Sequence, residues 1–428
     1  MPSSEVGAAT SLGWMPEFQA PVGTFDVLPP ESLRYERLVA RFAEHAGRAG
    51  FGLVVSPMFE DVGVFTRVGE STDVVRKEMY DFEDKGGRRL ALRPEGTAGV
   101  VRAFVQHRPP TPFKAWYVAP NFRYERPQKG RFRQHHQLGV EALGSDDPDL
   151  DVEVIALAWR FYADLGVARV RLDLTSLGDE RCRPAYRDLL LAHLGSRRDH
   201  LCGEHRDGYA DNPLRVLDCK KPGCIEATSD APAQVDHLCD PCQQHFDRVT
   251  AGLGALAIPH DLNRRLVRGL DYYTRTTFSF VAEALDSAQN EAGGGGRYDR
   301  LAEMLGGPAT PGIGFGLGIE RILLVCEAEG VFPTPGHLPL QVFVIDTTGG
   351  EQARDTIDQL RAVGIAADRA YDNRSFKAQL KAALRSGARY ALVYEDDGVQ
   401  LRTLQEKGEP ETVDPGSIVD HVRKRLAE

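Results

Sequence analysis

Residues 122–141 read FRYERPQKGRFRQHHQLGVE, a stretch with too much charge for an ordinary strand and too much regularity for a loop. Five Lys or Arg lie between Phe122 and Arg133, and two adjacent histidines follow them. We predict two strands here, residues 115–125 and 134–144, joined by a loop around the letters PQKGR. The sequence therefore predicts a hairpin with a cationic loop, which calls for a negatively charged partner.

Side chains alternate between the two faces of a strand, so the polar groups of this hairpin should gather on common faces. Arg123 and Glu125 would share a face of the first strand. One face of the second strand would present His135, Gln137, Gly139 and Glu141. The rim of the loop would carry Arg126, Lys129, Arg131 and Arg133. Such a surface suits a polar ligand with phosphate groups, to which Arg can form bidentate hydrogen bonds. The alternative is an edge hairpin that faces solvent.

Size and composition exclude several classes of protein. The chain has 428 residues, 42% of them hydrophobic, which is enough for two or three domains with their own cores. Its formal net charge of -10 argues against a protein that coats DNA, so a negatively charged partner would meet local basic patches. No apolar run approaches the roughly 20 residues that cross a bilayer, and residues 1–20 lack the features of a secretory signal. We expect a cytoplasmic protein that binds neither membrane nor DNA, with residues 1–20 as a flexible extension.

The first part of the body has a clear helical pattern. Residues 31–49 carry Leu38, Phe42 and Ala46 at helical spacing, and a buried strand, FGLVVSPMFE, is expected at 51–60.

The remaining patterns predict where the domains begin and end. The body is expected to span residues 21–330, with an insertion at about 185–260, where prolines interrupt a polar segment that bears Cys and His. Residues 331–336 are interpreted as a linker because Pro and Gly are dense there. Strands and helices alternate over residues 337–428, which favours a small α/β domain with a largely parallel sheet.

Alternating glycines mark a second constellation, GIGFGLGIER at 312–321. In a strand, one face of this segment would be apolar and the other would carry no side chains, so a flat ring could approach the backbone closely. Arg321 follows at the start of an apolar helix, and the run GGGGRYD lies nearby at 293–299. The alternative is that the glycines only permit tight packing of the sheet.

Two further segments combine polar groups in short spans. The segment LVRGLDYYTRTTF, 266–278, would place in one strand Arg268, Asp271, Tyr272, Tyr273 and Arg275. The turn RPEGT would deliver Glu95 and Thr97 just ahead of a helix. The alternatives are ordinary core tyrosines and a helix start capped by Thr97.

Four cysteines form two pairs in the insertion. Cys219 and Cys224 are separated by four residues, and Cys239 and Cys242 by two. Together they could form a tetrahedral, structural zinc site, and the alternative is a set of reduced thiols without metal.

Taken together, these segments resemble the class II aminoacyl-tRNA synthetases and, within them, the histidyl-tRNA synthetase family. FRYERPQKGRFRQHHQLG is similar to motif 2 of that class, and GIGFGLGIERI to motif 3. RPEGT and LVRGLDYYTRT resemble the two histidine signatures, and the helix followed by FGLVVSPMFE resembles the dimer-forming motif 1. The resemblance implies a homodimer with an α+β catalytic domain on an antiparallel sheet, plus a C-terminal α/β domain like the family's anticodon-binding domain.

The resemblance also implies a reaction in which histidine and ATP form histidyl-adenylate and diphosphate, with Mg²⁺ bridging phosphates, before the histidyl group passes to the 3′ end of histidine tRNA. The implied catalytic residues are Arg123 and Arg268. The implied histidine-binding residues are Glu95, Gly96, Thr97, Gln137, Glu141, Arg268, Tyr272 and Tyr273. The implied ATP-binding residues are Arg123, Glu125, His135 and Arg321. The implied contacts to the tRNA acceptor end are Arg126, Gln128, Lys129 and Arg131.

Two positions depart from the family pattern, and one other function shares the fold. Val22 stands where the family usually has Arg, and His135 where an aromatic ring often stacks on adenine. The alternative function is a non-catalytic, histidine-sensing regulatory paralogue, which generally lacks the tail and an intact second histidine signature. In the tail, one predicted helix face is basic and would meet either tRNA or solvent: Arg374, Lys377, Lys381, Arg385 and Arg389.

Overall fold

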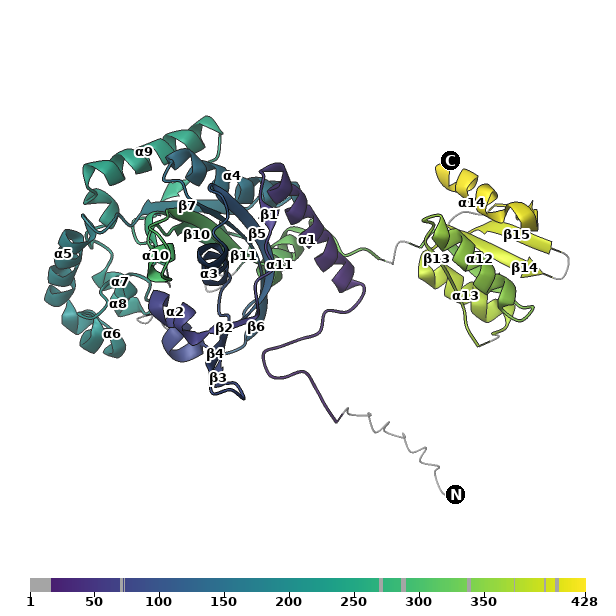
Figure 1. Cartoon of the computed structure of the whole chain (residues 1–428), viewed down its shortest axis with the longest axis horizontal. Coiled ribbons are helices and arrows are strands. Elements are labelled where there is room, and N and C mark those ends of the chain that lie inside the picture. The colour runs from purple at the N-terminus through teal and green to yellow at the C-terminus, as the bar shows by residue number, and fades with distance from the viewer. Residues whose placement is uncertain are drawn as a thin grey trace, which may run out of the picture. The chain divides into compact units, whose positions relative to one another are not determined.

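The computed structural model describes residues 17–69, 72, 74–268, 272–285, 290–336, 340–372, 374–395, 398–404 and 408–428. The chain divides into two compact units (Figure 1). The larger unit holds most of the chain up to Pro333, and the smaller one holds Thr334–Glu428 together with Val27–Glu36. Within the described residues, none of the helices combines the length and apolar character that crossing a membrane requires.

The larger unit is built on an eight-stranded sheet in the order β1-β5-β6-β11-β10-β9-β7-β8. The strands are β1 (Gly52–Leu53), β5 (Phe113–Phe122), β6 (Gln134–Leu143), β7 (Val170–Ser176), β8 (Asp261–Leu262), β9 (Thr274–Ala282), β10 (Glu291–Arg297) and β11 (Gly312–Gly318). All neighbours from β5 to β7 run antiparallel, which confirms the predicted sheet, while the short edge strands β1 and β8 pair in parallel and make the sheet mixed.

A smaller sheet and several helices complete this unit. The small sheet has the order β2-β4-β3, formed by β2 (Phe59–Asp61), β3 (Asp81–Glu83) and β4 (Arg89–Leu92). The helices outside the insertion are α1 (Glu31–Arg48), α2 (Val62–Gly69), α3 (Thr97–His107), α4 (Pro148–Asp164), α10 (Leu301–Met304) and α11 (Ile319–Glu329), with a π-helical turn at Val74–Glu78.

All the regular secondary-structure elements of the predicted insertion are helices or 3₁₀ turns. Its helices are α5 (Arg183–Ser196), α6 (Gly203–Gly208), α7 (Leu214–Leu217), α8 (Pro222–Ala227) and α9 (Asp240–Ala255), with 3₁₀ turns at Arg198–His200 and Gln234–Asp236. Figure 1 shows α5 to α8 gathered beyond one end of the large sheet.

Helices cover both faces of the large sheet. Leu38, Phe42 and Ala46 of α1 are fully buried, as predicted, and the Phe42 ring packs 6.0 Å from the ring of Trp116 in β5. The neighbouring residues of β5, Ala115 and Tyr117, face the other way and pack in a cluster with α3. The polar face of β6 lies on the α3 side.

The predicted buried strand at 51–60 is wrong. The segment forms only the two-residue β1 and the start of β2, and Val55 between them is 84% exposed. Pro57 has no N–H to donate to a ladder. Arg93 Nη1 donates hydrogen bonds to the carbonyl oxygens of Ser56 and Pro57, at 3.1 and 3.3 Å. These carbonyl groups therefore bond to a side chain and not to a neighbouring strand.

Two other predicted strands are shorter than expected. β5 ends at Phe122, because the chain turns tightly as the Glu125 N–H donates to the carbonyl of Arg123 at 2.8 Å. Arg123 and Glu125 therefore lie beyond the strand. β9 begins at Thr274, so Arg268, Tyr272 and Tyr273 precede it, while Asp271 lies outside the described residues.

The smaller unit is a five-stranded sheet in the order β13-β12-β14-β15-β16. Its elements are β12 (Val342–Asp346), α12 (Glu351–Ala362), β13 (Ala367–Arg369), α13 (Phe376–Ser386), β14 (Tyr390–Glu395), β15 (Gly398–Thr403), β16 (Glu411–Val413), a 3₁₀ turn at Pro415–Ser417 and α14 (Ile418–Ala427). The first three strands in this order run parallel, as predicted, whereas the sequence analysis missed the antiparallel β15 and β16. α13 carries Lys377, Lys381 and Arg385 at exposed positions, and the other two members of the predicted basic face lie beyond its ends.

A buried ion pair ties the insertion to the large sheet. Arg297 of β10 and Asp151 of α4 both have fully buried side chains, and Arg297 Nη2 lies 2.5 Å from Asp151 Oδ1. The other carboxylate oxygen of Asp151 lies 2.8 Å from Nε2 of His245 in α9. Arg297 also donates to the carbonyl of Ser145 at 3.1 Å, so the guanidinium is well supplied with acceptors.

We predict that Asp151→Asn lowers the free energy of unfolding of the larger unit by about 3 kcal/mol, because it leaves the buried Arg297 charge with only the more exposed Asp299, at 3.2 Å, as an ionic partner. The control is Asp149→Asn on the same helix, whose side chain is 67% exposed and should change stability by less than about 1 kcal/mol. Denaturant unfolding followed by circular dichroism measures both. Equal stability of the two variants would show that the buried pair does not stabilise the fold.

Candidate active site

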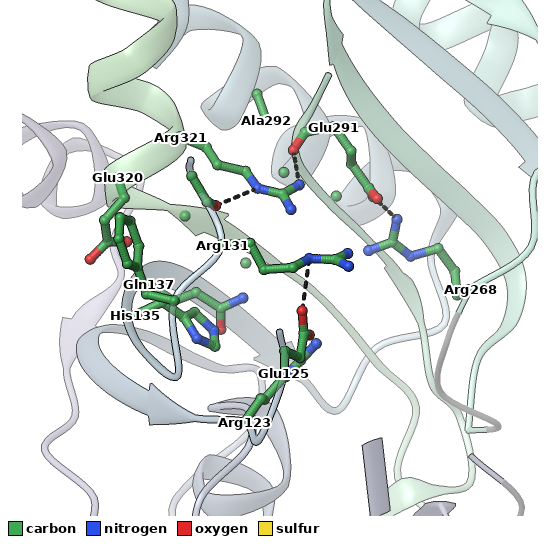
Figure 2. Close-up of a pocket in the computed structure, with 16 residues that line it drawn as sticks. Arg123, Glu125, Arg131, His135, Gln137, Arg268, Glu291, Ala292, Glu320 and Arg321 are labelled. Carbon is green, nitrogen blue, oxygen red and sulfur yellow. Dashed lines mark hydrogen bonds and ion pairs between the residues drawn. The ribbon is translucent and has the colours of Figure 1, made fainter. Parts of the chain in front are cut away.

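Seven charged side chains surround a pocket of about 800 Å³, including its open mouth, in the larger unit. β6, β10 and β11 form its floor, and the loop between β5 and β6 forms one wall. Figure 2 shows the seven charged side chains that line it: Arg123, Arg131, Arg268, Arg321, Glu125, Glu291 and Glu320. The volume is in the range of sites that bind nucleotides and other small ligands.

The floor of the pocket is bare backbone. β11 has buried Ile313, Phe315 and Leu317 on one face and glycines on the other, as predicted. A Cβ at Gly316 would lie 3.0 Å from Nε2 of Gln137. A Cβ at Gly294 of β10 would lie 2.8 Å from Nη1 of Arg268. The glycines thus leave room for the polar side chains above them and for a flat ligand.

Four arginines reach the pocket, and glutamates or backbone carbonyls hold each of them (Figure 2). Arg268 forms an ion pair with Glu291, and Arg321 Nη1 donates to the Glu291 carbonyl oxygen at 2.5 Å. The side chains of Arg131 and Glu125 pair at 2.7 Å. Arg123 Nε donates to the Pro94 carbonyl at 2.8 Å.

Burial disfavours the charge of Arg268, yet the carboxylate of Glu291 keeps the pKa of Arg268 above its ordinary value. With four arginines against three glutamates, the pocket can accept a polyanion.

His135 presents an uncharged ring to the pocket. Burial, together with the positive charges of Arg123 and Arg321, lowers the pKa of His135 to about 3. The ring is therefore neutral at physiological pH and can stack on a base without adding charge. The neighbouring His136 is held by Glu320, whose Oε1 lies 2.8 Å from His136 Nδ1 and 3.0 Å from its backbone nitrogen.

Glu141 lies fully buried in β6, at the deep end of the polar face. Its carboxyl oxygens accept from the hydroxyls of Thr97 at 2.7 Å and of Tyr298 at 2.5 Å. Burial raises the pKa of Glu141 to about 8. Opposite it in β11, a Cβ at Gly314 would lie 1.9 Å from Oε2, so only glycine leaves space for this carboxyl group.

Glu95, rather than Thr97, caps α3, which corrects the alternative in which Thr97 caps the helix. The Glu95 carboxylate accepts from the backbone N–H groups of Thr97 at 2.6 Å and Ala98 at 2.9 Å. Thr97 is the first helical residue, and its hydroxyl is used by Glu141 instead. Burial raises the pKa of Glu95, against the lowering effect of these hydrogen bonds.

The structure brings most of the predicted residues to this region. Gln137 lines the pocket and accepts from Asn121 Nδ2 at 2.7 Å. Tyr272 and Tyr273 are buried, and the Tyr273 ring centroid lies 5.9 Å from the guanidinium carbon of Arg268. The loop residues that do not line the pocket are exposed on its outer side: Arg126, Gln128 and Lys129.

The sequence analysis gave no role to Glu291 or Glu320, which hold Arg268 and His136. Glu291 directly precedes the glycine run, and Glu320 lies inside the GIGFGLGIER segment, ahead of Arg321. The available signal was the position of each glutamate at or within a glycine-rich segment of the predicted ligand site.

The predicted four-cysteine zinc site is wrong. The described Cys219 and Cys224 cluster with Cys202 and His205, whereas Cys239 and Cys242 cluster with Asp179 and Cys182. The end of α8 and a 3₁₀ turn separate the two pairs, and each pair folds back onto an earlier segment. The available signal was the pair Cys202 and His205, which are three residues apart.

Comparison with known proteins identifies the family. The family model described as histidyl-tRNA synthetase matches residues 23–178 and 218–322. Histidine–tRNA ligases of Corynebacterium kroppenstedtii and Mycobacterium marinum are each 49% identical, covering 96% of this chain and 98% and 100% of theirs. The apo histidyl-tRNA synthetase of S. aureus superposes with a TM-score of 0.80 at 33% identity, covering 95% of this chain and all of that one. The chain therefore belongs to the histidyl-tRNA synthetase family.

Proposed function

We propose that the arginine-lined pocket activates histidine with ATP and then passes the histidyl group to tRNA. The chain is a histidine–tRNA ligase, an aminoacyl-tRNA ligase that forms AMP and diphosphate. The observation that carries the proposed assignment of residues is the convergence of four arginines over a floor of bare glycine backbone. Among the described residues lining the pocket there is no Ser or Cys nucleophile, which agrees with catalysis by positioning and charge neutralisation.

ATP would lie across the glycine floor. Its adenine would stack on the neutral ring of His135, and Glu125 would accept from the adenine amino group. Arg321 would bind the γ-phosphate, because its guanidinium borders the pocket where Gly130 and Glu291 hold it by their carbonyl oxygens. In the described structure Glu125 pairs with Arg131. When ATP binds, the adenine amino group would replace Arg131 as the partner of Glu125.

The chemical step would take place between Arg123 and Arg268. An oxygen of the histidine carboxylate attacks the α-phosphorus, the bond from phosphorus to the bridging oxygen breaks, and diphosphate leaves. Arg123 and Arg268 would neutralise the charge that develops on the α-phosphoryl oxygens, and Arg268 would also hold the histidine carboxylate. Preorganised donors of this kind stabilise the transition state without reorganisation.

Histidine would occupy the deep end of the polar face of β6. Glu95, Thr97 and Gln137 would receive its α-amino group, with Gly96 and Tyr272 as walls. Glu141 would accept from one imidazole nitrogen, and the Tyr273 hydroxyl would adapt to the other. A Cβ at Gly96 would lie 2.4 Å from the Tyr117 ring, so glycine is needed where α3 approaches the sheet.

Mg²⁺ prefers oxygen ligands and usually binds through one or two carboxylates together with substrate phosphates. Glu291 and Glu320 are the pocket carboxylates beside the proposed phosphate position, so the donor set fits Mg²⁺. When bound with ATP, the ion would neutralise and bridge the phosphates. In the described structure, Glu291 meanwhile orients Arg268.

The acceptor end of tRNA would meet the exposed loop residues Arg126, Gln128, Lys129 and Arg131. The loop is anchored at its base, because the Arg133 guanidinium stacks 4.0 Å above the Tyr124 ring and its Nε donates to the Glu125 carbonyl. Residues 337–428 would form a separate domain that reads the anticodon. The exposed side chains of Lys377, Lys381 and Arg385 would supply phosphate contacts there.

A homodimer is supported by exposed apolar side chains in the motif 1 region. Leu53 is 54% exposed, and the neighbouring Val55, Met58 and Phe59 are also exposed. The Phe59 ring packs 6.4 Å from the exposed Phe82 ring, so the apolar surface is continuous. Contiguous apolar surface of this kind marks an interface in most proteins. We place the enzyme in the cytoplasm, where its substrates meet.

The regulatory alternative finds no support. The ligase relatives match 96% of this chain, a share that extends into the tail. The second histidine signature is intact, and its Arg268 lies in the pocket.

We predict that Arg268→His slows histidine-dependent exchange of diphosphate into ATP by about 10²-fold or more, as expected for loss of a transition-state donor. The control is Arg264→His in the same segment, whose side chain is 56% exposed and pairs with Asp236 outside the pocket. The control should exchange at the wild-type rate. Near-normal exchange in folded Arg268→His protein would remove Arg268 from the catalytic step.

Glu141→Gln should weaken histidine binding by about 1.5 to 3 kcal/mol, the range for a hydrogen bond to a charged group, because a bound imidazolium would favour the charged form of Glu141 despite its raised pKa. The ATP site should stay intact. Separate Michaelis constants for histidine and ATP in diphosphate exchange measure this. We expect the histidine constant to rise by about 10- to 100-fold, with the ATP constant unchanged. A rise confined to the ATP constant would show that Glu141 does not read the imidazole.

Replacement of Lys377, Lys381 and Arg385 by Glu should leave diphosphate exchange unchanged and raise the Michaelis constant for tRNA. The slope of the logarithm of affinity against the logarithm of salt concentration should fall by about one per lost phosphate contact. The control carries the same charge change on α12 and α14, at the exposed Arg354, Arg423 and Lys424. Equal effects of the two variants on tRNA charging would contradict a tRNA contact through α13.

A further inference from the structure

The insertion contains a compact set of metal-binding side chains outside the active site. Cys202 directly precedes α6, His205 lies within it, Cys219 follows α7, and Cys224 lies in α8. One ligand atom from each residue lies within 4.8 Å of all the others. His205 Nδ1 lies 3.4 Å from the sulfur of Cys202 and 3.6 Å from that of Cys224.

We propose that Cys202, His205, Cys219 and Cys224 together bind one structural zinc ion. Zinc in structural sites is tetrahedral, and three cysteines with one histidine are one of its usual ligand sets. Zn–S and Zn–N bonds of about 2.3 and 2.0 Å at the tetrahedral angle place sulfur and nitrogen about 3.5 Å apart. The two measured separations, 3.4 and 3.6 Å, match this edge. Binding would release the thiol protons to solvent.

The surroundings of the cluster suit a closed structural site. Cys224 is fully buried, and the other three ligands are half-buried. The backbone N–H of Cys202 donates to the Cys224 sulfur at 3.3 Å, a contact that stabilises and orients a bound thiolate. Lys221, between Cys219 and Cys224 in the sequence, would offset the net negative charge of a zinc ion with three thiolates, whereas Lys220 pairs with Asp218 at 3.1 Å.

A zinc ion at this site would stabilise the local fold. α6, α7 and α8 have six, four and six residues, which is too short for helices that hold by themselves. The core beneath them is small, and Cys224 is itself a member, with Cys202 and Cys219 packed against it. A zinc ion would join all three helices at one point, which is how small segments compensate for a limited core.

The second cluster, Asp179 with Cys182, Cys239 and Cys242, provides an internal comparison. Its carboxylate is already engaged, because Asp179 Oδ2 lies 2.6 Å from Arg181 Nη2 and Oδ1 accepts from the Arg181 backbone at 3.0 Å. The fourth member of that cluster is therefore a carboxylate that Arg181 already holds, although its Oδ1 lies 3.7 Å from the sulfurs of Cys182 and Cys239. The Cys202 cluster has a histidine nitrogen directed at its sulfurs instead.

The proposed zinc site also borders the segment that carries Arg268. Arg265 Nη2 donates to the carbonyl of Leu217, two residues before Cys219, at 3.1 Å. Val267 packs against the same small core. Two of the four cluster residues, His205 and Cys219, line a cavity that Arg268 and Tyr273 also line.

The test is elemental analysis of the full-length protein, expressed with zinc and purified without chelator. We expect Cys219→Ser to contain about one zinc per chain less than the wild type, and Cys242→Ser to contain as much as the wild type. Equal zinc in Cys219→Ser and wild-type protein would overturn the proposal. So would loss of zinc from Cys242→Ser alone.

A second measurement needs no variant and is independent of diphosphate exchange. Thiol alkylation of wild-type protein, read by peptide mass spectrometry before and after chelation, identifies the cysteines that the metal protects. Chelation should expose Cys202, Cys219 and Cys224, and added zinc should restore their protection. Protection of Cys182, Cys239 and Cys242 instead, or a disulfide among Cys202, Cys219 and Cys224, would contradict the assignment.

Discussion

The active site depends on the close approach of β11 to the side chains of β6. Side chains on the facing β11 residues would collide with Glu141 and press against Gln137, since a Cβ at Gly314 or Gly316 would lie 1.9 or 3.0 Å from them. The bare strand is therefore the condition for burying a carboxyl group in the middle of a sheet. That carboxyl group accepts from Thr97 at the start of α3 and from Tyr298 after β10, so one point orients two flanking segments.

Charge is organised locally in a chain whose net charge is -10. Each pocket arginine is held by a glutamate or by carbonyl oxygens, which limits its freedom before a ligand arrives. Donors that are already oriented lose little entropy and little solvation when a phosphate binds. Burial, together with the positive charges of Arg123 and Arg321, lowers the pKa of His135 and keeps its ring neutral at the base position.

Periodicity predicted much of the fold and of the site, because strand alternation and helical spacing are local properties. It placed His135, Gln137 and Glu141 on one face of β6 and predicted a glycine face for β11, whereas the structure shows that these two strands are neighbours. Local pattern could not show that β5 ends before Arg123, since a turn competes with strand pairing there.

The cysteine pairing was also beyond local pattern. The spacing of the cysteines predicted one site built from two neighbouring pairs. In the structure, each pair instead joins residues that precede it in the chain, and the tertiary path of α5 to α9 decides which residues these are.

This path also determines how the insertion meets the catalytic region. Arg265 and Val267, immediately ahead of Arg268, rest on the core that the Cys202 cluster borders. Arg268 is thus held in two places. Its guanidinium pairs with Glu291 in the pocket, and the residues just ahead of it, Arg265 and Val267, contact the insertion. A segment fixed only by Glu291 would have to reposition when a ligand competes for that arginine. Anchoring its backbone outside the pocket allows the ion pair to open without loss of the site.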